Sequence, residues 1–248
     1  MIDHIYKHTR LYLNAPFAQS AEIPLAHAQI HYLRNVLRKE SGDILRVFNA
    51  QHGEWTARLE MAGKKNGHVV LEQCFKVQPK PALSRHLYFS PIKKQRMDML
   101  IEKSVELGVT DLHPVLMNRT VMRKINKERI EAQIIEAAEQ SERLDIPALH
   151  DALNLDDVLR TYDHRTPLYA CLERSEKVKP ITSFAMDQPV SFLIGSEGGF
   201  DEGEMARLLK DDNLKPIGLG DTILRAETAA IACLSYAALA CLCETKKN

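Results

Sequence analysis

The spacing of apolar residues divides the chain into a front part of short strands and a longer part in which strands and helices alternate. In the front part, the turn signals His52-Gly53 and Asn66-Gly67 separate short runs of strand-forming residues. These runs predict strands at 10–13, 44–48, 54–59 and 68–72, with a helical turn at 28–38. The even spacing of the last three strands predicts a small meander or barrel with Trp55 in its core.

The pattern changes after Gln78-Pro79-Lys80-Pro81, where two prolines favour an extended linker. Beyond it we expect strands at 87–89, 112–117, 168–172, 190–194 and 216–219, and helices at 96–107, 128–143, 154–162, 204–209 and 227–243. Alternation of this kind predicts an α/β fold with a mostly parallel sheet covered by helices. We therefore expect two domains, residues 1–76 and residues 77–248.

A glycine turn follows the apolar strand that ends at Ile194. It reads Gly195-Ser196-Glu197-Gly198-Gly199, and Asp201 with Glu204 has the sequence of a capping box at the start of the next helix. A second glycine turn, residues 217–221, follows the next strand. Ligands of open α/β sheets bind at the carboxyl ends of strands, so both turns are candidate walls of a ligand site. Neither contains G-x-G-x-x-G or a Walker loop, which disfavours a nicotinamide or P-loop enzyme.

Arg225 and Glu227 come directly before a helix that carries almost no other charge. An arginine between two apolar residues must reach either a polar partner or a solvent-filled cleft. One interpretation is structural: Glu227 complements the helix N-terminus, and Arg225 pairs with it at the surface. The other is a role in the ligand site, because both residues follow the second glycine turn.

The formal net charge is zero, but its distribution is uneven: residues 1–124 carry a surplus of about eight positive charges and the remainder an equal deficit. Basic residues on three separate elements favour a phosphate-contacting surface, although each group alone is typical of a solvated face. They are His31 with Arg34 and Arg38, Lys93 with Arg96, and Arg119 with Arg123.

Other features narrow the class of protein. The five cysteines are odd in number and form no C-x-x-C pair, which favours reduced thiols in the cytoplasm, and Cys171 is expected to pack rather than to react. The N-terminus lacks the pattern of a signal peptide. The apolar run 229–243 is shorter than the roughly 20 residues of a membrane span and predicts a buried helix. The histidines show no metal-ligand spacing, so no metal is expected.

Combined, the two glycine turns resemble the paired carboxyl-terminal motifs of the knotted SPOUT class of RNA methyltransferases, in the stretches 194–199 and 219–229. Within that class the chain resembles the RsmE group, whose members methylate N3 of a uridine in the 16S ribosomal RNA of the small subunit. Further matching stretches, at 31–38, 96–108, 118–121 and 139–143 with Pro147, extend the resemblance over nearly the whole chain.

The resemblance implies a knotted, Rossmann-like α/β domain with a parallel sheet, preceded by a small PUA-like β-barrel that binds RNA. It also implies S-adenosylmethionine as cofactor, 16S rRNA of the small subunit as partner, and a homodimer whose subunits complete each other's sites. The implied cofactor contacts are Leu172, Ile194, Gly195, Glu197, Gly198, Gly199, Ile217, Leu219, Gly220, Ile223, Leu224, Arg225 and Thr228. The implied RNA contacts are His31, Arg34, Arg38, Lys93, Arg96, Arg119, Arg123 and Arg143.

Methylation at N3 requires an unpaired or extruded uridine, because N3 lies on the Watson–Crick edge, and it requires loss of the N3 proton. Arg225 is the expected stabiliser of the uracil anion, and Glu197 and Glu227 are the candidates for the base. Backbone turning or helix capping explains either glutamate equally well. Ser196 and Ala226 replace a proline and a threonine common in the family. Glu142 replaces a frequent glycine, which bears on the local loop and on Arg143 as an RNA contact.

Two other functions fit the same scaffold. One is a SPOUT enzyme that methylates a ribose 2′-oxygen or another rRNA or tRNA position. The other is a non-catalytic protein that binds RNA or the ribosome. The position of the methyl group on the product and the binding of S-adenosylmethionine separate the three possibilities.

Overall fold

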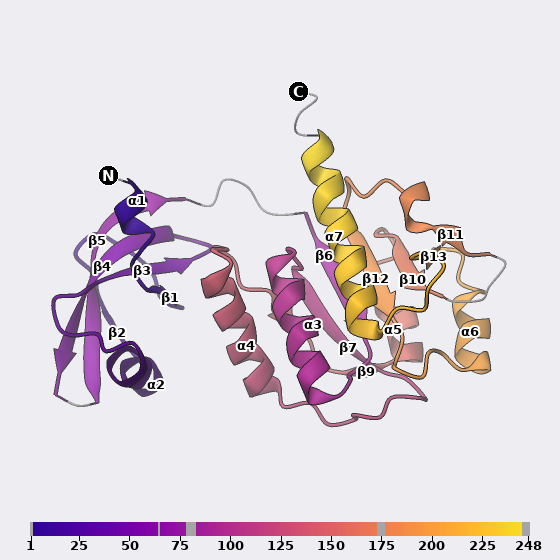
Figure 1. Cartoon of the computed structure of the whole chain (residues 1–248), viewed down its shortest axis with the longest axis horizontal. Helices are drawn as coiled ribbons and strands as arrows, with labels where there is room; N and C mark the ends of the chain where they lie inside the picture. The colour runs from indigo at the N-terminus through magenta and orange to yellow at the C-terminus, as the bar shows by residue number, and fades with distance from the viewer. Residues whose placement is uncertain (1, 64, 78–82, 173–176, 245–248) are drawn as a thin grey trace. The chain divides into compact units, whose positions relative to one another are not determined.

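The computed structural model describes residues 2–63, 65–77, 83–172 and 177–244, and the chain forms two compact units. The first contains residues 1–81 together with 138–146, and the second contains residues 82–137 and 147–248. Figure 1 labels their helices and strands. The expected linker, residues 78–81, lies outside the described residues. The segment 138–146 joins the first unit, a long-range packing that the periodicity of the sequence does not encode.

The first unit is built on a five-stranded sheet in the order β1-β3-β4-β5-β2. β1 pairs with β3 in parallel, and the other neighbours are antiparallel. The strands are β1 (Arg10–Tyr12), β2 (Glu22–Pro24), β3 (Ile44–Asn49), β4 (Gly53–Ala62) and β5 (Asn66–Lys76), accompanied by α1 (Ile2–Ile5), α2 (His27–His31) and a π-helical turn at Tyr32–Val36. The strands and the helical turn predicted from the hydrophobic pattern are confirmed. β2 was not predicted, because it carries one buried apolar residue, Ile23, beside a glutamate and a proline.

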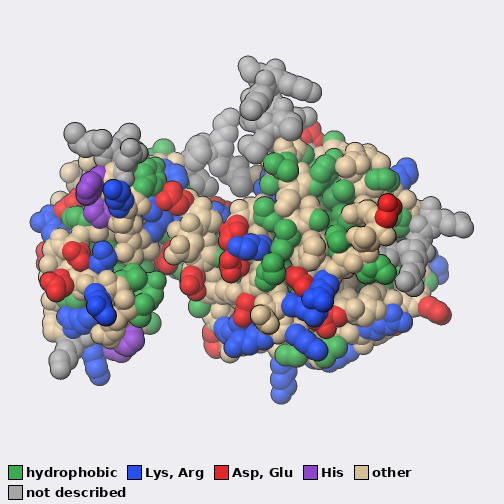
Figure 2. Space-filling model, in the orientation of Figure 1, with side chains coloured by type: hydrophobic (Ala, Val, Ile, Leu, Met, Phe, Trp, Pro, Cys, Tyr) green, Lys and Arg blue, Asp and Glu red, His purple; other side chains and the backbone are tan. Residues whose placement is uncertain are grey.

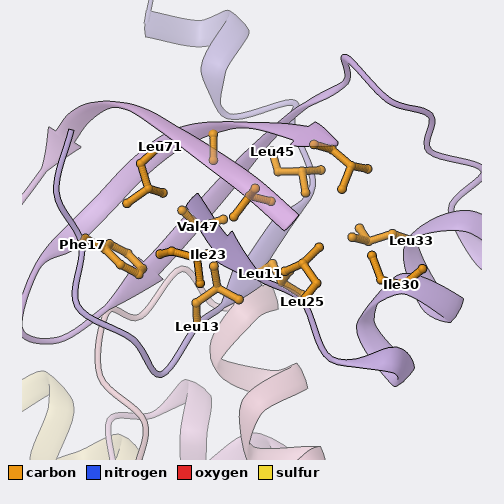
Figure 3. Close-up of a cluster of buried hydrophobic side chains, with 13 residues drawn as sticks. Leu11, Leu13, Phe17, Ile23, Leu25, Ile30, Leu33, Leu45, Val47 and Leu71 are labelled. Carbon is orange, nitrogen blue, oxygen red and sulfur yellow. The ribbon is translucent and has the colours of Figure 1, made fainter. Parts of the chain in front are cut away.

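One hydrophobic cluster holds this unit together, and Figure 3 shows its side chains converging between the strands and the α2 segment. Ile30 and Leu33 are fully buried from the helical side, and Leu45, Val47 and Leu59 are fully buried from the sheet. Burial of this kind contributes about 1.5–3 kcal/mol for each large aliphatic side chain. Trp55 is half-buried and packs at the margin of the cluster, where its indole N–H donates to the His52 carbonyl at 2.8 Å.

A buried charge network lies on the same sheet. The Glu54 side chain is completely buried, and Arg10 donates to it from Nε at 2.8 Å while Arg46 Nη1 lies 3.4 Å away. Arg46 also bonds the Glu142 carboxylate at 2.8 Å, and Arg10 donates to the Ala138 carbonyl at 2.7 Å. The network therefore attaches the segment 138–146 to the sheet.

The network also involves the end of helix α4 (Lys127–Gln140). We expected this helix to continue to residue 143, and that boundary is wrong. Glu142 has φ of +59°, a left-handed conformation that ends the helical hydrogen-bonding pattern and explains why a glycine suits the position. The carboxylate of Glu142 is instead held by Arg46, so the glutamate has a structural partner.

The second unit contains a parallel sheet in the order β11-β13-β10-β12-β6-β7-β8, with β9 paired to β7. Its strands are β6 (Arg85–Phe89), β7 (Asp111–Leu116), β8 (Ala148–Leu149), β9 (Leu153–Asn154), β10 (Leu168–Cys171), β11 (Lys179–Pro180), β12 (Val190–Ile194) and β13 (Leu214–Gly218). The predicted parallel sheet is confirmed. The two-residue strands β8, β9 and β11 were not predicted, because they are too short for a pattern.

Helices cover this sheet, as expected from the alternation of elements. They are α3 (Lys94–Glu106), α5 (Leu155–Thr161), α6 (Glu202–Leu208) and α7 (Ala226–Glu244), with a 3₁₀ turn at Ile181–Ser183. Helix α7 packs on β12 and β6, and α3 packs on α7; Figure 1 shows this pair in front of the sheet. Leu155, Val158 and Leu208 bring α5 and α6 into the core cluster around β10 and β12. No helix in the described part of the chain is long and apolar enough to cross a membrane.

Candidate functional site

The first glycine turn is a tight loop at the carboxyl end of β12. The Gly199 N–H donates to the Ser196 carbonyl at 2.8 Å, and the Ser196 hydroxyl donates back to the Gly199 carbonyl at 2.9 Å. Gly199 has φ of +71°, a conformation that favours glycine. A Cβ on Gly195 would lie 3.0 Å from the Phe200 ring. These glycines therefore permit a sharp reversal that brings the backbone close to whatever occupies the strand end.

Arg119, which follows β7, holds this loop in place. Its Nη1 donates to the Gly198 carbonyl at 2.8 Å and lies 3.3 Å from the Phe200 carbonyl. The sequence suggested Arg119 as an RNA contact. In the structure its guanidinium binds carbonyl groups of the glycine loop, so a substitution of Arg119 is expected to disturb the loop as well as any contact with RNA.

The capping box predicted at the start of α6 is confirmed. The Glu204 N–H donates to Asp201 Oδ1 at 2.7 Å, and the Asp201 N–H donates to Glu204 Oε2 at 2.9 Å. Asn118 joins them, because its backbone N–H donates to Glu204 Oε1 at 2.8 Å and its amide donates to Asp201 Oδ2 at 2.6 Å. The hydrogen bonds from Glu204 and Asn118 hold the pKa of Asp201 below its usual value. Asn118 was not predicted as a site residue, although a polar residue close after a buried strand is a usable signal in the sequence.

Arg96 lies between the two glutamates considered as bases. Its Nη1 donates to Glu197 Oε1 at 2.9 Å, and its Nε lies 3.8 Å from Glu227 Oε1. Glu227 is 5% exposed, and its Oε2 has no hydrogen-bond partner within the described residues. A buried carboxylate oxygen without a partner is costly unless a ligand completes it. Arg96 was expected to contact RNA. In the structure it lies against the carboxylates of Glu197 and Glu227 instead.

Arg225 is exposed at the end of the segment that precedes α7. Among the described residues its guanidinium has no hydrogen bond or ion pair. The surface pair between Arg225 and Glu227, one of the two interpretations of the sequence, is not present, because Glu227 lies against Arg96 instead. Arg225 therefore remains available to a ligand.

The second glycine turn completes the site from the other side of β10. β13 and β12 flank β10 in the sheet, so the two turns follow strands on either side of one central strand. Leu172 directly follows β10, and its N–H donates to the Ile217 carbonyl at 3.3 Å. Gly220 has φ of +121°, and a Cβ on Gly218 would lie 2.9 Å from Val178. The three strand ends thus form one edge at which backbone groups are accessible.

The remaining candidate cofactor residues surround this edge. Leu172, Ile194 and Ile217 are buried and supply its apolar floor. Leu219 and Leu224 are half-buried, and Ile223 and Thr228 are exposed. In Figure 2 charged side chains of both signs gather near the amino end of α7, and hydrophobic side chains cover its length.

The basic residues suggested as RNA contacts differ in their surroundings. In the first unit, His31 and Arg38 are exposed and Arg34 is half-buried; Arg34 and Arg38 line a surface hollow together with Lys39. Arg143, also in the first unit, has a side chain only 11% exposed and bonds Asp145 at 2.6 Å. The structure therefore gathers two of these arginines on one surface and holds Arg143 in an internal ion pair.

Lys93 and Arg123 are the other basic candidates, and both belong to the second unit. Lys93 is exposed directly before α3. The Arg123 guanidinium lies 3.3 Å from the Met117 carbonyl and 3.4 Å from the Asn118 carbonyl. Arg123 thereby holds the segment that carries Asn118, while Lys93 is free of any comparable contact in the described structure.

Comparison with known proteins assigns the fold and the family. Residues 78–238 match the family model of an RNA methyltransferase domain, and residues 25–72 match that of an RNA methyltransferase PUA domain. The chain belongs to this family of RNA methyltransferases. The predicted combination of an α/β RNA methyltransferase domain preceded by a PUA-like domain is confirmed.

Similar proteins agree with this assignment over nearly the full length of the chain. The ribosomal RNA small subunit methyltransferase E of Rickettsia conorii is 34% identical over 236 residues, which cover 94% of this chain and 96% of the relative. A putative methyltransferase of Legionella pneumophila, solved with bound S-adenosylmethionine, is 31% identical with a TM-score of 0.85 and coverage of 94% and 98%. The small subunit methyltransferase E of Neisseria gonorrhoeae, also solved with S-adenosylmethionine, is 26% identical with a TM-score of 0.82 and coverage of 92% and 96%. The resemblance noted from the motifs is thus confirmed by independent comparison.

Proposed function

We propose that this RNA methyltransferase transfers the methyl group of S-adenosylmethionine to N3 of a specific uridine in 16S ribosomal RNA of the small subunit. The observation that carries the proposal is the edge formed by two glycine turns on either side of β10, in a chain that belongs to the RNA methyltransferase family. The full-length similarity to small subunit methyltransferases E supports the choice of RNA.

The residues at this edge fit the cofactor. The loop at Gly195 and Gly199 and the turn at Gly220 permit close backbone approach, and the buried floor of Leu172 and Ile217 suits an apolar ring. The unpartnered Oε2 of Glu227 requires a donor, which a ligand with hydroxyl or amino groups provides. When bound, S-adenosylmethionine supplies an activated methyl group. The contacts implied by the resemblance, including Gly198, Leu219, Leu224 and Thr228, remain part of this proposal.

The protein's own contribution is to orient the uridine and to manage the N3 proton. We assign the stabilisation of the uracil anion to Arg225, because its guanidinium is exposed and free of partners in the described structure. Glu197 and Glu227 remain the candidates for the base. Arg96 bonds one oxygen of Glu197 and lies near one oxygen of Glu227, and it thereby positions both carboxylates.

The finer features of the resemblance belong to the same proposal. The basic surfaces with His31, Arg34, Arg38 and Lys93 are assigned to RNA backbone contacts in the cytoplasm, with residues 1–76 as the RNA-binding domain and residues 77–248 as the knotted catalytic domain. A homodimer is supported by apolar side chains exposed on the packed pair of helices α3 and α7, where Met99 is 49% and Leu239 61% exposed. Light scattering coupled to gel filtration measures the oligomeric state.

The test incubates the purified chain with small subunits from cells that lack the enzyme and with S-adenosylmethionine, followed by nuclease digestion and mass analysis. We expect one N3-methyluridine in 16S rRNA. A methyl group on a ribose oxygen or on tRNA contradicts the proposed specificity, and binding without transfer contradicts catalysis.

Arg225→Ala tests the assigned role within the same assay. We expect transfer to fall by about 10²–10³-fold, the usual cost of removing a charge-stabilising donor, with the fold intact. Arg207→Ala is the matched control, because Arg207 is an arginine of the same unit in an exposed pair with Asp156. Full activity of Arg225→Ala removes Arg225 from the mechanism.

A further inference from the structure

Three histidines and an aspartate from three separate segments of the chain lie together on the sheet of the second unit. His86 is on β6, Asp111 and His113 are on β7, and His150 follows β8. The parallel register places His86 beside Asp111 and Tyr88 beside His113. Because alternate residues of a strand share one face, these side chains project from the same side of the sheet.

The donor atoms of this cluster converge. His86 Nδ1 lies 3.0 Å from His113 Nε2 and 3.8 Å from Asp111 Oδ2. One ligand atom from each of the three residues fits within 4.8 Å. Two imidazole nitrogens bound to one tetrahedral Zn²⁺ are about 3.3 Å apart, so the observed pair needs only a small adjustment to accept an ion between them.

Neighbouring rings fix the orientation of the central histidine. The His113 ring stacks on Tyr88 at 4.3 Å with an interplanar angle of 13°, and on His150 at 4.0 Å with an angle of 9°. His150 Nε2 in turn lies 2.8 Å from Asp111 Oδ1. A metal ligand held by stacking, and a carboxylate held by a second histidine, are the supporting contacts that metal sites use to orient their ligands.

The chemistry of the three side chains suits metal binding. Each imidazole can offer a ring nitrogen, and the carboxylate can offer an oxygen, to a metal ion.

We propose that His86, Asp111 and His113 form a binding site for a divalent transition-metal ion of the Zn²⁺ type, with His150 as the residue that orients Asp111. Two imidazoles and one carboxylate form a ligand set that suits Zn²⁺ rather than Mg²⁺ or Ca²⁺. Spacing along the chain gave no sign of this site, because His86 on β6 meets Asp111 and His113 on β7 only through the pairing of the two strands. It lies toward the amino ends of β6 and β7, whereas the glycine turns follow the carboxyl ends of strands, so the ion has a structural role that joins β6, β7 and the β8 segment.

The test uses the full chain, freed of any purification tag and treated with a chelator, titrated with ZnCl₂ by calorimetry and with Co²⁺ by visible absorption. We expect one ion per chain and the intense bands of four-coordinate Co²⁺. His86→Gln and His113→Gln should each abolish the bands, and His150→Gln should weaken affinity by about 10–100-fold. Circular dichroism identifies the variants that keep the native fold.

His68→Gln is the matched control. His68 lies on β5 of the first unit, 3.5 Å from Glu60 and 3.9 Å from Glu22, so it is a histidine beside two carboxylates without a second imidazole. It should leave Zn²⁺ binding unchanged. The proposal is overturned if the wild-type chain binds no stoichiometric Zn²⁺, or if a folded His113→Gln or His86→Gln variant binds it as the wild type does. If a variant fails to fold, the titration of the wild-type chain with Zn²⁺ still tests the proposal.

Discussion

Replacing Glu54 by glutamine tests whether the buried charge network holds the first unit together. The Glu54 side chain is completely buried, and the side chains of Arg10 and Arg46 beside it are 3% and 6% exposed. Burial lowers the pKa of Arg10, which means that burial disfavours its charged form and that the charge needs a carboxylate partner. Glu54→Gln preserves shape but leaves two buried guanidinium groups with one carboxylate fewer.

The expected cost is large. Removing one partner of a buried ion pair destabilises a protein by about 3–5 kcal/mol, because the remaining charge stays buried without compensation. At roughly 1.4 kcal/mol for each factor of ten, the unfolding equilibrium shifts by about a hundredfold to several thousandfold. With a urea dependence of about 1–3 kcal/mol per molar, the midpoint of unfolding should fall by about 1 M or more.

Urea unfolding followed by tryptophan fluorescence measures this effect selectively. Trp55 is the chain's single tryptophan and lies next to Glu54 on β4, so its emission reports on the first unit alone. The matched control is Glu60→Gln on the same strand. The Glu60 side chain is 52% exposed, and its loss should change the unfolding free energy by less than about 0.5 kcal/mol.

The reasoning is refuted if Glu54→Gln and Glu60→Gln unfold at the same urea concentration with equal slopes. A shared midpoint would mean that the two arginines find equivalent partners without Glu54. The carbonyls of Ala138 and Arg143, which accept hydrogen bonds from Arg10, are the groups that would have to supply them.

Three further predictions concern the second unit. Gly195→Ala should weaken S-adenosylmethionine binding by about tenfold or more by calorimetry, since its Cβ would press at 3.0 Å on an aromatic ring that backs the loop; wild-type affinity contradicts this. Asp201→Ala should lower the melting temperature at neutral pH. The hydrogen bond from the Glu204 N–H lowers the pKa of Asp201 in the folded state. The difference in melting temperature between wild type and variant should therefore persist above the unfolded pKa of about 3.9 and vanish as the pH falls through the folded pKa. A difference that stays constant down to acid pH would oppose this. Hydrogen bonding to Cys171, 3.4 Å away, together with burial raises the pKa of Cys233, so mass analysis should find that iodoacetamide labels it only after unfolding.

The sequence by itself determined the local structure. Strands and helices were predicted correctly where a run of strand-forming residues or a periodicity of 3.6 residues extended over a full element, as in β3 and β12 for strands and α3 for helices. The capping box of Asp201 and Glu204 was predictable because both partners lie within four residues of each other. The motifs at 194–199 and 219–229 were sufficient to indicate the family, since their residue types serve a local backbone geometry.

Tertiary structure decided which of these local pieces meet. Arg96 lies between Glu197 and Glu227, and Arg119 holds the loop at Gly198, although both arginines resembled ordinary surface charges in the sequence. The early end of α4 depends on the left-handed Glu142 and its bond to a distant arginine. Strand order and register are set by pairings between residues tens of positions apart, and local spacing carries no record of them. The cluster of His86, Asp111 and His113 forms because β6 pairs with β7 in this register.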